Sequence, residues 1–237
     1  MPIRRVSSGI KDLDALIEGG FPEGDVILYS GLPGTGKTVA CMQFIADGLK
    51  KGEDCIYVAS EETRGKVIEN ATLLGFGFKG ALRKKKLEIF QVEDIAFQDP
   101  LGRKCKLPRD PEKRAERLTA SIAKWMEKCD GKRLVIDSLM AYAIDEPAEH
   151  RELLNSELVR SLDGLGMTTI IVSELPGRGY SRDGVTDVMA DGIVLFGRET
   201  DGVECWKTLE VAKMRATKVI DRISRFEIGR GGIKFIE

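Results

Sequence analysis

Residues 31–38 read GLPGTGKT, a stretch whose residue types and spacing can hold phosphate groups. Glycines let several backbone N–H groups converge on phosphate oxygens, lysine adds a positive charge that reaches the β and γ phosphates, and the final threonine offers Mg²⁺ a hydroxyl. The pattern G-x-x-x-x-G-K-[ST] is specific when a strand precedes it and a helix follows. Lys37 is therefore also a catalytic candidate. The candidate phosphate-binding residues are Gly34, Thr35, Gly36, Lys37, Thr38 and Val39.

Three acidic side chains follow other predicted strands at the same edge of the sheet. Asp137 ends the apolar run at 133–137 and could bind Mg²⁺ together with Thr38. Glu61 and Glu62 follow the strand predicted at 54–60, and either can position or deprotonate a water that attacks a phosphate. The alternative is that these residues are helix caps, with Glu61 and Glu62 capping the helix predicted from residue 64.

The hydrophobic pattern predicts how these residues are positioned. Apolar runs alternate with helical periods, which is typical of a parallel sheet covered by helices. The predicted strands are at 25–31, 54–60, 87–92, 133–137 and 168–174, and the helices at 37–52, 64–75, 112–129 and 150–166. Beyond Gly192, four runs joined by tight turns predict an antiparallel edge, at 192–197, 203–214, 222–229 and 232–237. The fold class is α/β: a mostly parallel, twisted sheet flanked by helices on both faces, with a C-terminal antiparallel β extension.

Composition limits the possible classes of protein. A chain of 237 residues with 42% hydrophobic content fits one domain, at 1–237. Lys+Arg 37 against Asp+Glu 38 gives a net charge of −1, which excludes a global basic field for nucleic acid or anionic membrane. Because no run of about 18 apolar residues occurs, we expect no membrane contact and a cytoplasmic protein.

Two cations near the C-terminal end lack an obvious local purpose. Lys213 and Arg215 are two residues apart in a predicted strand, so their side chains share one face while Met214 projects from the other. Such cations can discourage aggregation of a sheet edge, or they can bind an anion. The second interpretation is favoured because the 31–38 site has no obvious arginine of its own.

Taken together, these segments resemble the RecA superfamily of P-loop ATPases, and within it the KaiC-like branch. The resemblance covers nearly the whole chain. It is carried by SSGIKDLDALIEGGFPEGDVILYSGLPGTGKT at 7–38, VASEETRGKVIENATLLGFGF at 58–78, LVIDSL at 134–139, IIVSE at 170–174, ADGIVLF at 190–196 and VAKMRATKVIDRISRFEIGRGGI at 211–233. It implies a RecA-type core that hydrolyses ATP with Mg²⁺ and assembles as a homo-oligomeric ring, usually a hexamer, with ATP held between neighbours.

The resemblance also implies roles for the C-terminal residues. Lys213 and Arg215 would act on the γ-phosphate in the next subunit's site, with Met214 and Thr217 as further nucleotide-binding candidates. Ala216 replaces the family's glycine, and Val219 stands where relatives often have histidine, so base recognition differs from the family pattern. The positions of the clock protein's phosphoacceptor hydroxyls are occupied by Asp187 and Val188. We therefore expect ATP hydrolysis without clock-type autophosphorylation.

Three functional hypotheses remain open at the level of sequence. The first is a ring ATPase that regulates or remodels a protein partner. The second is a recombinase-like ATPase that contacts single-stranded DNA through residues 175–184, where Arg178, Tyr180 and Arg182 combine cations with an aromatic ring. The third is a scaffold that binds ATP with little turnover. A proline-rich stretch at 98–111 is predicted to be a surface loop or lid.

Overall fold

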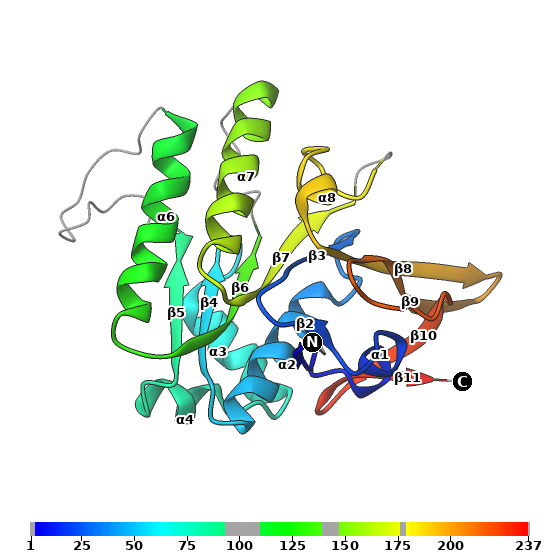
Figure 1. Cartoon of the computed structure of the whole chain (residues 1–237). Helices are drawn as coiled ribbons and strands as arrows, with labels where there is room; N and C mark the ends of the chain where they lie inside the picture. The colour runs from blue at the N-terminus through cyan, green and yellow to red at the C-terminus, as the bar shows by residue number, and fades with distance from the viewer. Residues whose placement is uncertain (1–2, 93–109, 139–146, 176–178, 237) are drawn as a thin grey trace.

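The computed structural model describes residues 3–92, 110–138, 147–175 and 179–236 (Figure 1). Nine strands form one sheet in the order β11-β10-β9-β8-β3-β7-β6-β4-β5, and β1 pairs with β2 separately. The strands are β1 Arg5–Val6, β2 Phe21–Pro22, β3 Val26–Gly31, β4 Asp54–Ala59, β5 Leu87–Gln91, β6 Gly131–Asp137, β7 Thr168–Glu174, β8 Gly192–Asp201, β9 Glu204–Met214, β10 Ser224–Gly229 and β11 Gly232–Ile236. The helices are α1 Lys11–Leu16, α2 Lys37–Lys50, α3 Arg64–Leu73, α4 Phe78–Arg83, α6 Pro111–Met126, α7 Ala148–Asp163 and α8 Thr186–Met189.

The parallel part of the sheet contains β8, β3, β7, β6, β4 and β5. Every residue of β3 and β4 is buried, which explains why these strands read as continuous runs without polar alternation. Strands β7 and β6 lie between β3 and β4, so helix α2 crosses two strands before the chain re-enters the sheet. The predicted parallel sheet is confirmed.

Helices cover both faces of this sheet (Figure 1). One apolar cluster joins α1, α2, α3 and α4 to their face, with Phe44 of α2 fully buried. A second cluster joins α6 and α7 to the opposite face, through residues such as Leu118 and Leu158. In the described part of the chain, no helix is long and apolar enough to cross a membrane.

The C-terminal strands form the predicted antiparallel extension. Strand β9 pairs antiparallel with β8, β10 with β9, and β11 with β10. The register of β8 and β9 shifts within this extension, because Val211 lies opposite Val194 whereas Lys213 lies opposite Ile193. Ala212 is therefore an extra residue in β9 and forms a β-bulge.

A fully buried arginine fixes α2 against the sheet. The Arg133 side chain donates from Nε to Glu53 at 2.5 Å and from one terminal nitrogen to Asp47 at 2.8 Å. Its other terminal nitrogen donates to the carbonyls of Phe44 at 2.8 Å and Ser7 at 3.0 Å. The buried charge is thus fully paired, which offsets its desolvation. Because Arg133 and Asp137 lie on the same strand, this cluster helps to set the distance between α2 and Asp137.

Some local elements differ from the sequence-based expectations. The predicted loop at 98–111 ends earlier, because Asp110 caps α6 and Pro111 is its first residue. The remainder of that loop, at 98–109, lies outside the described residues. The short helix α4 was not predicted, because its six residues are too few to show a helical period in the sequence.

Candidate functional site

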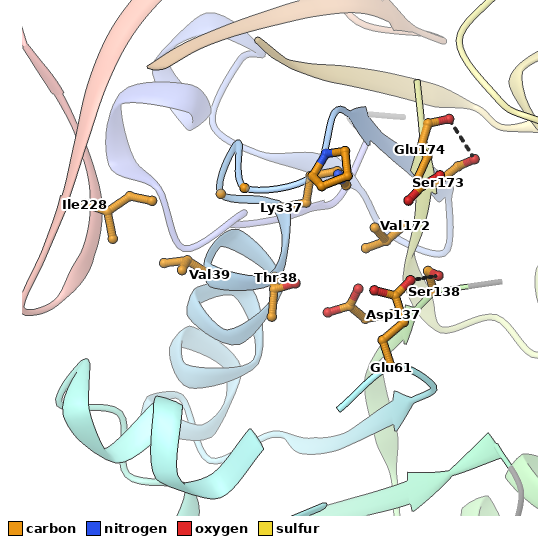
Figure 2. A pocket seen from close by; sticks show the side chains of 13 residues that line it. Lys37, Thr38, Val39, Glu61, Asp137, Ser138, Val172, Ser173, Glu174 and Ile228 are labelled. Atoms are coloured by element: carbon orange, nitrogen blue, oxygen red, sulfur yellow. Dashed lines mark hydrogen bonds between the residues drawn. The ribbon is translucent and has the colours of Figure 1, made fainter. Parts of the chain in front are cut away.

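The candidate phosphate-binding loop connects β3 to α2 at the carboxyl edge of the sheet (Figure 2). Gly34 and Gly36 have φ angles of 78° and 112°, which residues with a side chain rarely adopt. These glycines turn the chain sharply so that α2 begins at Lys37, with its N-terminus at the pocket. The first turn of α2 has no acidic residue, so its unpaired N–H groups can attract an anion.

Lys37 and Thr35 stabilise the shape of this loop. The Lys37 ammonium donates to the carbonyls of Gly31 at 2.6 Å and Leu32 at 3.0 Å, and the Thr35 hydroxyl donates to Leu32 at 2.8 Å. Burial lowers the pKa of Lys37, an effect opposed by nearby acidic groups, with Asp137 the strongest. Lys37 is the one cation among the described residues that line the pocket. It is therefore the positive charge that this chain itself supplies for phosphate.

Asp137 and Thr38 provide the oxygen ligands expected of a magnesium site. Burial raises the pKa of Asp137, whereas hydrogen bonds from Tyr57 and Thr38 lower it. The Tyr57 hydroxyl donates to the carboxylate at 2.6 Å. Within the described ranges, no group of three or more His, Cys, Asp or Glu residues could enclose a metal. This donor set fits Mg²⁺, which in phosphate sites takes few protein ligands and completes its shell with phosphate oxygens and water.

Glu61 is held beside Asp137 in the same pocket (Figure 2). Its carboxylate accepts a hydrogen bond of 2.9 Å from the Ser138 hydroxyl. Ser138 is fixed in turn by its backbone N–H, which donates to the Ser60 hydroxyl at 2.6 Å, and the peptide bond between Asp137 and Ser138 is cis. Glu61 is therefore a positioned carboxylate at the end of β4, as a general base requires.

Glu62 points elsewhere. Its carboxylate accepts hydrogen bonds of 3.0 and 3.2 Å from the Asn70 amide on α3, and its carbonyl accepts one of 2.8 Å from Gln91. Glu62 is absent from the described lining of the pocket. The structure thus separates the two adjacent glutamates, and a catalytic role for Glu62 stays a prediction.

Sequence reasoning missed several residues of the pocket lining. Ser173 and Glu174 enter at the end of β7, and Ile228 enters from β10 (Figure 2). Arg182 reaches Glu174 with an ion pair of 3.0 Å. Glu174, like Asp137, follows an apolar run in the sequence, and this position could have identified it as a candidate for the pocket. Nothing in the sequence around Ile228 indicates the pocket, because Ile228 reaches it only when the C-terminal extension folds back toward α2.

The predicted trans-acting cations lie outside this pocket. The Lys213 ammonium donates to the carbonyls of Asp187, Val188 and Ala190, at 3.2, 3.0 and 2.6 Å, around the C-terminal end of α8. Arg215 pairs with Asp191 at 2.8 Å. Lys213 and Arg215 therefore reach the same surface region, and their action on a phosphate of the next subunit stays a prediction.

The two remaining candidates of this segment are also placed away from the pocket. Met214 is buried in the core on the face opposite Lys213. The Thr217 hydroxyl donates to the Arg215 carbonyl and accepts a hydrogen bond from Arg5, both at 3.0 Å. Within one copy of the chain, the structure therefore does not bring Lys213, Met214, Arg215 or Thr217 to the phosphate-binding loop.

A phosphate-binding loop after β3, an acid at the end of β6 and a carboxylate after β4, on this sheet, define the class of P-loop proteins with a RecA-type fold. Comparison with known families gives the same result in finer detail. The family model described as "ATPase: KaiC" matches residues 6–237. The chain belongs to this KaiC ATPase family, whose name implies nucleotide binding.

Individual relatives match along almost the full length. A UPF0273 protein of Methanopyrus kandleri is 34% identical over 240 residues, covering 99% of this chain and 92% of the relative. A UPF0273 protein of Thermotoga maritima is 34% identical over 233 residues, covering 98% and 95%. Among solved structures, a KaiC-like protein of Pyrococcus horikoshii covers all of both chains with a TM-score of 0.85 at 30% identity. The KaiC-like, RecA-type fold is confirmed.

Proposed function

We propose that this protein is a Mg²⁺-dependent ATP phosphohydrolase whose 237 residues form one ATPase domain. The observation that carries the proposal is the position of Glu61, which a hydroxyl holds at 2.9 Å in the pocket of Lys37, Thr38 and Asp137. A protein that only binds nucleotide needs the phosphate-binding loop but has no need of a positioned carboxylate. This favours hydrolysis over the scaffold hypothesis.

Each residue of the pocket has a proposed task. The N–H groups at residues 34–39 and the Lys37 ammonium bind the phosphates and compensate their charge. Thr38 and Asp137 would hold Mg²⁺, which when bound neutralises charge on the phosphate oxygens. Glu61 orients the attacking water and accepts its proton. Ser138 and Tyr57 keep the two carboxylates in place.

The missing cation is proposed to come from a second copy of this chain. Lys213 and Arg215 lie on a different surface from the pocket, so a head-to-tail contact would be needed to bring them together. Both surfaces expose an apolar side chain: Leu32 beside the pocket is 56% exposed, and Val188 beside Lys213 is 68% exposed. Apolar contact between these points would support a ring, and the family resemblance favours a hexamer. Lys213 and Arg215 would then stabilise the charge of the phosphoryl group in transfer.

The proposed biological task is regulation or remodelling of a protein partner. For the DNA-binding alternative, Tyr180 is 42% exposed, but Arg182 is already paired with Glu174. Arg178, together with residues 176 and 177, lies outside the described part of the chain. With a net charge of −1, the protein lacks the general basic field that supports nucleic-acid binding.

The direct test is steady-state phosphate release from ATP by the full chain. We expect turnover that requires Mg²⁺ and is unchanged by single-stranded DNA at low and at moderate salt. Stimulation by DNA that disappears at higher salt would favour the recombinase alternative. Tight ATP binding without measurable turnover would contradict hydrolysis and leave the scaffold.

Assembly is tested separately by measuring the mass of the protein in solution with and without ATP and Mg²⁺. We expect an oligomer whose mass is a whole multiple of 26.2 kDa. A monomer under both conditions would contradict the role of Lys213 and Arg215 in trans, while leaving nucleotide binding by residues 34–39 untouched.

A further inference from the structure

Strand β9 presents lysines on both of its faces. Lys207 and Lys213 are six residues apart, and in a regular strand this even spacing would put both side chains on one face. The bulge at Ala212 changes this, because one extra residue reverses the alternation beyond it. Met214 therefore lies on the same face of β9 as Lys207, where it is buried with Leu209, and Lys213 lies on the opposite face. One strand therefore serves two separate surfaces.

On one face of β9, Lys207 contacts the phosphate-binding loop of its own chain. Its ammonium donates a hydrogen bond to the Gly34 carbonyl. On the neighbouring strand, Phe226 lies opposite Lys207, and a methyl group on Gly36 would meet Phe226 at 3.4 Å and Ile228 at 3.0 Å. Strands β9 and β10 thus contact both glycines that shape the loop.

The contact with Gly34 bears on phosphate binding because a trans peptide unit is planar. Its carbonyl and its N–H group point in opposite directions. Holding the Gly34 carbonyl from β9 keeps the N–H of Thr35 turned toward the inside of the loop, where Leu32 accepts it at 3.4 Å. A lysine on the outer side of the loop can therefore fix the direction of an N–H group on the inner side.

The opposite face and the end of β9 carry the cations proposed to act on the next subunit. Lys213 is fixed to the carbonyl groups around the end of α8, and Arg215 follows directly after the strand. A displacement of the loop that pulls on Lys207 would therefore be transmitted along β9 to Lys213. The path consists of one hydrogen-bonded strand, without an intervening loop.

We propose that Lys207 is a positioning residue that orients the phosphate-binding loop in cis and thereby couples nucleotide binding to β9, the strand that carries Lys213. This inference rests on the proposed function, since it concerns the same nucleotide site. It assigns Lys207 no contact with the nucleotide. It predicts that a chain whose own site is filled presents Lys213 and Arg215 differently to its neighbour.

The first test is equilibrium binding of a fluorescent ADP analogue with Mg²⁺ to the full chain and three variants. We expect Lys207→Met to raise the dissociation constant about fivefold, the effect of losing one charge-assisted hydrogen bond partly exposed to solvent. Lys207→Arg, which can still reach a carbonyl, should stay within twofold. Lys234→Met, at an exposed lysine of β11, is the matched control and should bind like the wild type.

The second test follows amide hydrogen exchange at residues 186–190 with and without saturating ADP. In the wild type and in Lys234→Met we expect ADP to change this exchange, and in Lys207→Met we expect no change even at full occupancy. An equal response in Lys207→Met, or unaltered ADP affinity, would overturn the inference. Failure of the wild type to bind ADP at all would instead contradict the proposed function.

Discussion

The carboxyl edge of the parallel strands and the antiparallel extension build two different kinds of site. At the edge, the ends of β3, β4, β6 and β7 bring their polar residues into one pocket within a single chain. In the extension, Lys213 of β9 and Arg215, which follows this strand, are bound to carbonyls and a carboxylate of their own chain and lie outside that pocket. The edge is thus complete as a binding site, whereas the extension gains a catalytic purpose only if a second copy docks against it.

The largest expected effect comes from removing Arg215, the cation of the extension that is proposed to act at the edge of a neighbouring chain. We expect Arg215→Ala to reduce ATP hydrolysis by about 10³-fold, because a cation supplied in trans stabilises the charge of the transferred phosphoryl group. ATP binding should change little, since the phosphate-binding loop is intact. Arg83→Ala, at an exposed arginine of α4, is the control and should retain full activity. The measurement is phosphate release, combined with nucleotide binding.

Mixing variants decides whether the arginine acts between chains. A Glu61→Gln chain has an intact Arg215, and an Arg215→Ala chain has an intact Glu61, so mixed rings would contain some complete sites. Partial recovery of hydrolysis in the mixture is expected. If the mixture shows only the sum of the residual activities, Arg215 acts within its own chain or merely charges a sheet edge.

A smaller effect distinguishes the two adjacent glutamates. We expect Glu61→Gln to lower the turnover number by about 10² to 10³, because it removes a general base that faces the pocket. Glu62→Gln makes the same chemical change one residue away, where the carboxylate binds Asn70, and should keep turnover within about threefold. Comparable losses in both variants would show that Glu62 turns into the pocket during the reaction.

The smallest expected effect concerns acidic residues near Arg215. Burial, followed by the charges of Asp191 and Asp163, raises the pKa of Asp25 to about 6, although Arg215 opposes the shift. The folded protein therefore binds a proton at Asp25 more tightly than the unfolded chain does. The folded protein loses this source of stability as the pH rises from about 4 through 6. Asp25→Asn should increase the free energy of unfolding at pH 7.5 by on the order of 1 kcal/mol, after allowance for the partial exposure of this side chain.

Denaturant unfolding of Asp25→Asn and of the wild type at pH 4 and pH 7.5 measures this difference. The two proteins should approach equal stability at pH 4, where Asp25 is protonated. A difference that is the same at both pH values would show that the substitution acts through packing rather than through charge.

The sequence predicted the edge of the parallel strands much better than the extension, for physical reasons. A phosphate-binding loop is a local pattern, and fully buried strands such as β3 reveal themselves by uninterrupted apolar runs. The sequence also placed Asp137 and Glu61 at the correct strand ends. It did not reveal that β7 and β6 separate β3 from β4, because strand order depends on contacts distant in the sequence.

Side-chain direction was the main limit on predicting the site. Glu61 and Glu62 are equivalent in sequence, and only the positions of Ser138 and Asn70 separate them. The bulge at Ala212 exists only as a mismatch between two strands, so the sequence of β9 alone cannot show it. The role of Lys207 was also missed, because its partner, Gly34, lies near the other end of the sequence.

The placement of β3 between β7 and β8 has a consequence for biosynthesis. Both neighbours of this strand begin at or beyond Thr168, so the phosphate-binding loop is translated long before its strand can form sheet hydrogen bonds. Pairing over such separations slows folding and leaves apolar strands exposed in the meantime. Nucleotide can therefore stabilise only chains that have completed most of the sheet, and it would act late in folding as a selective ligand for correctly finished molecules.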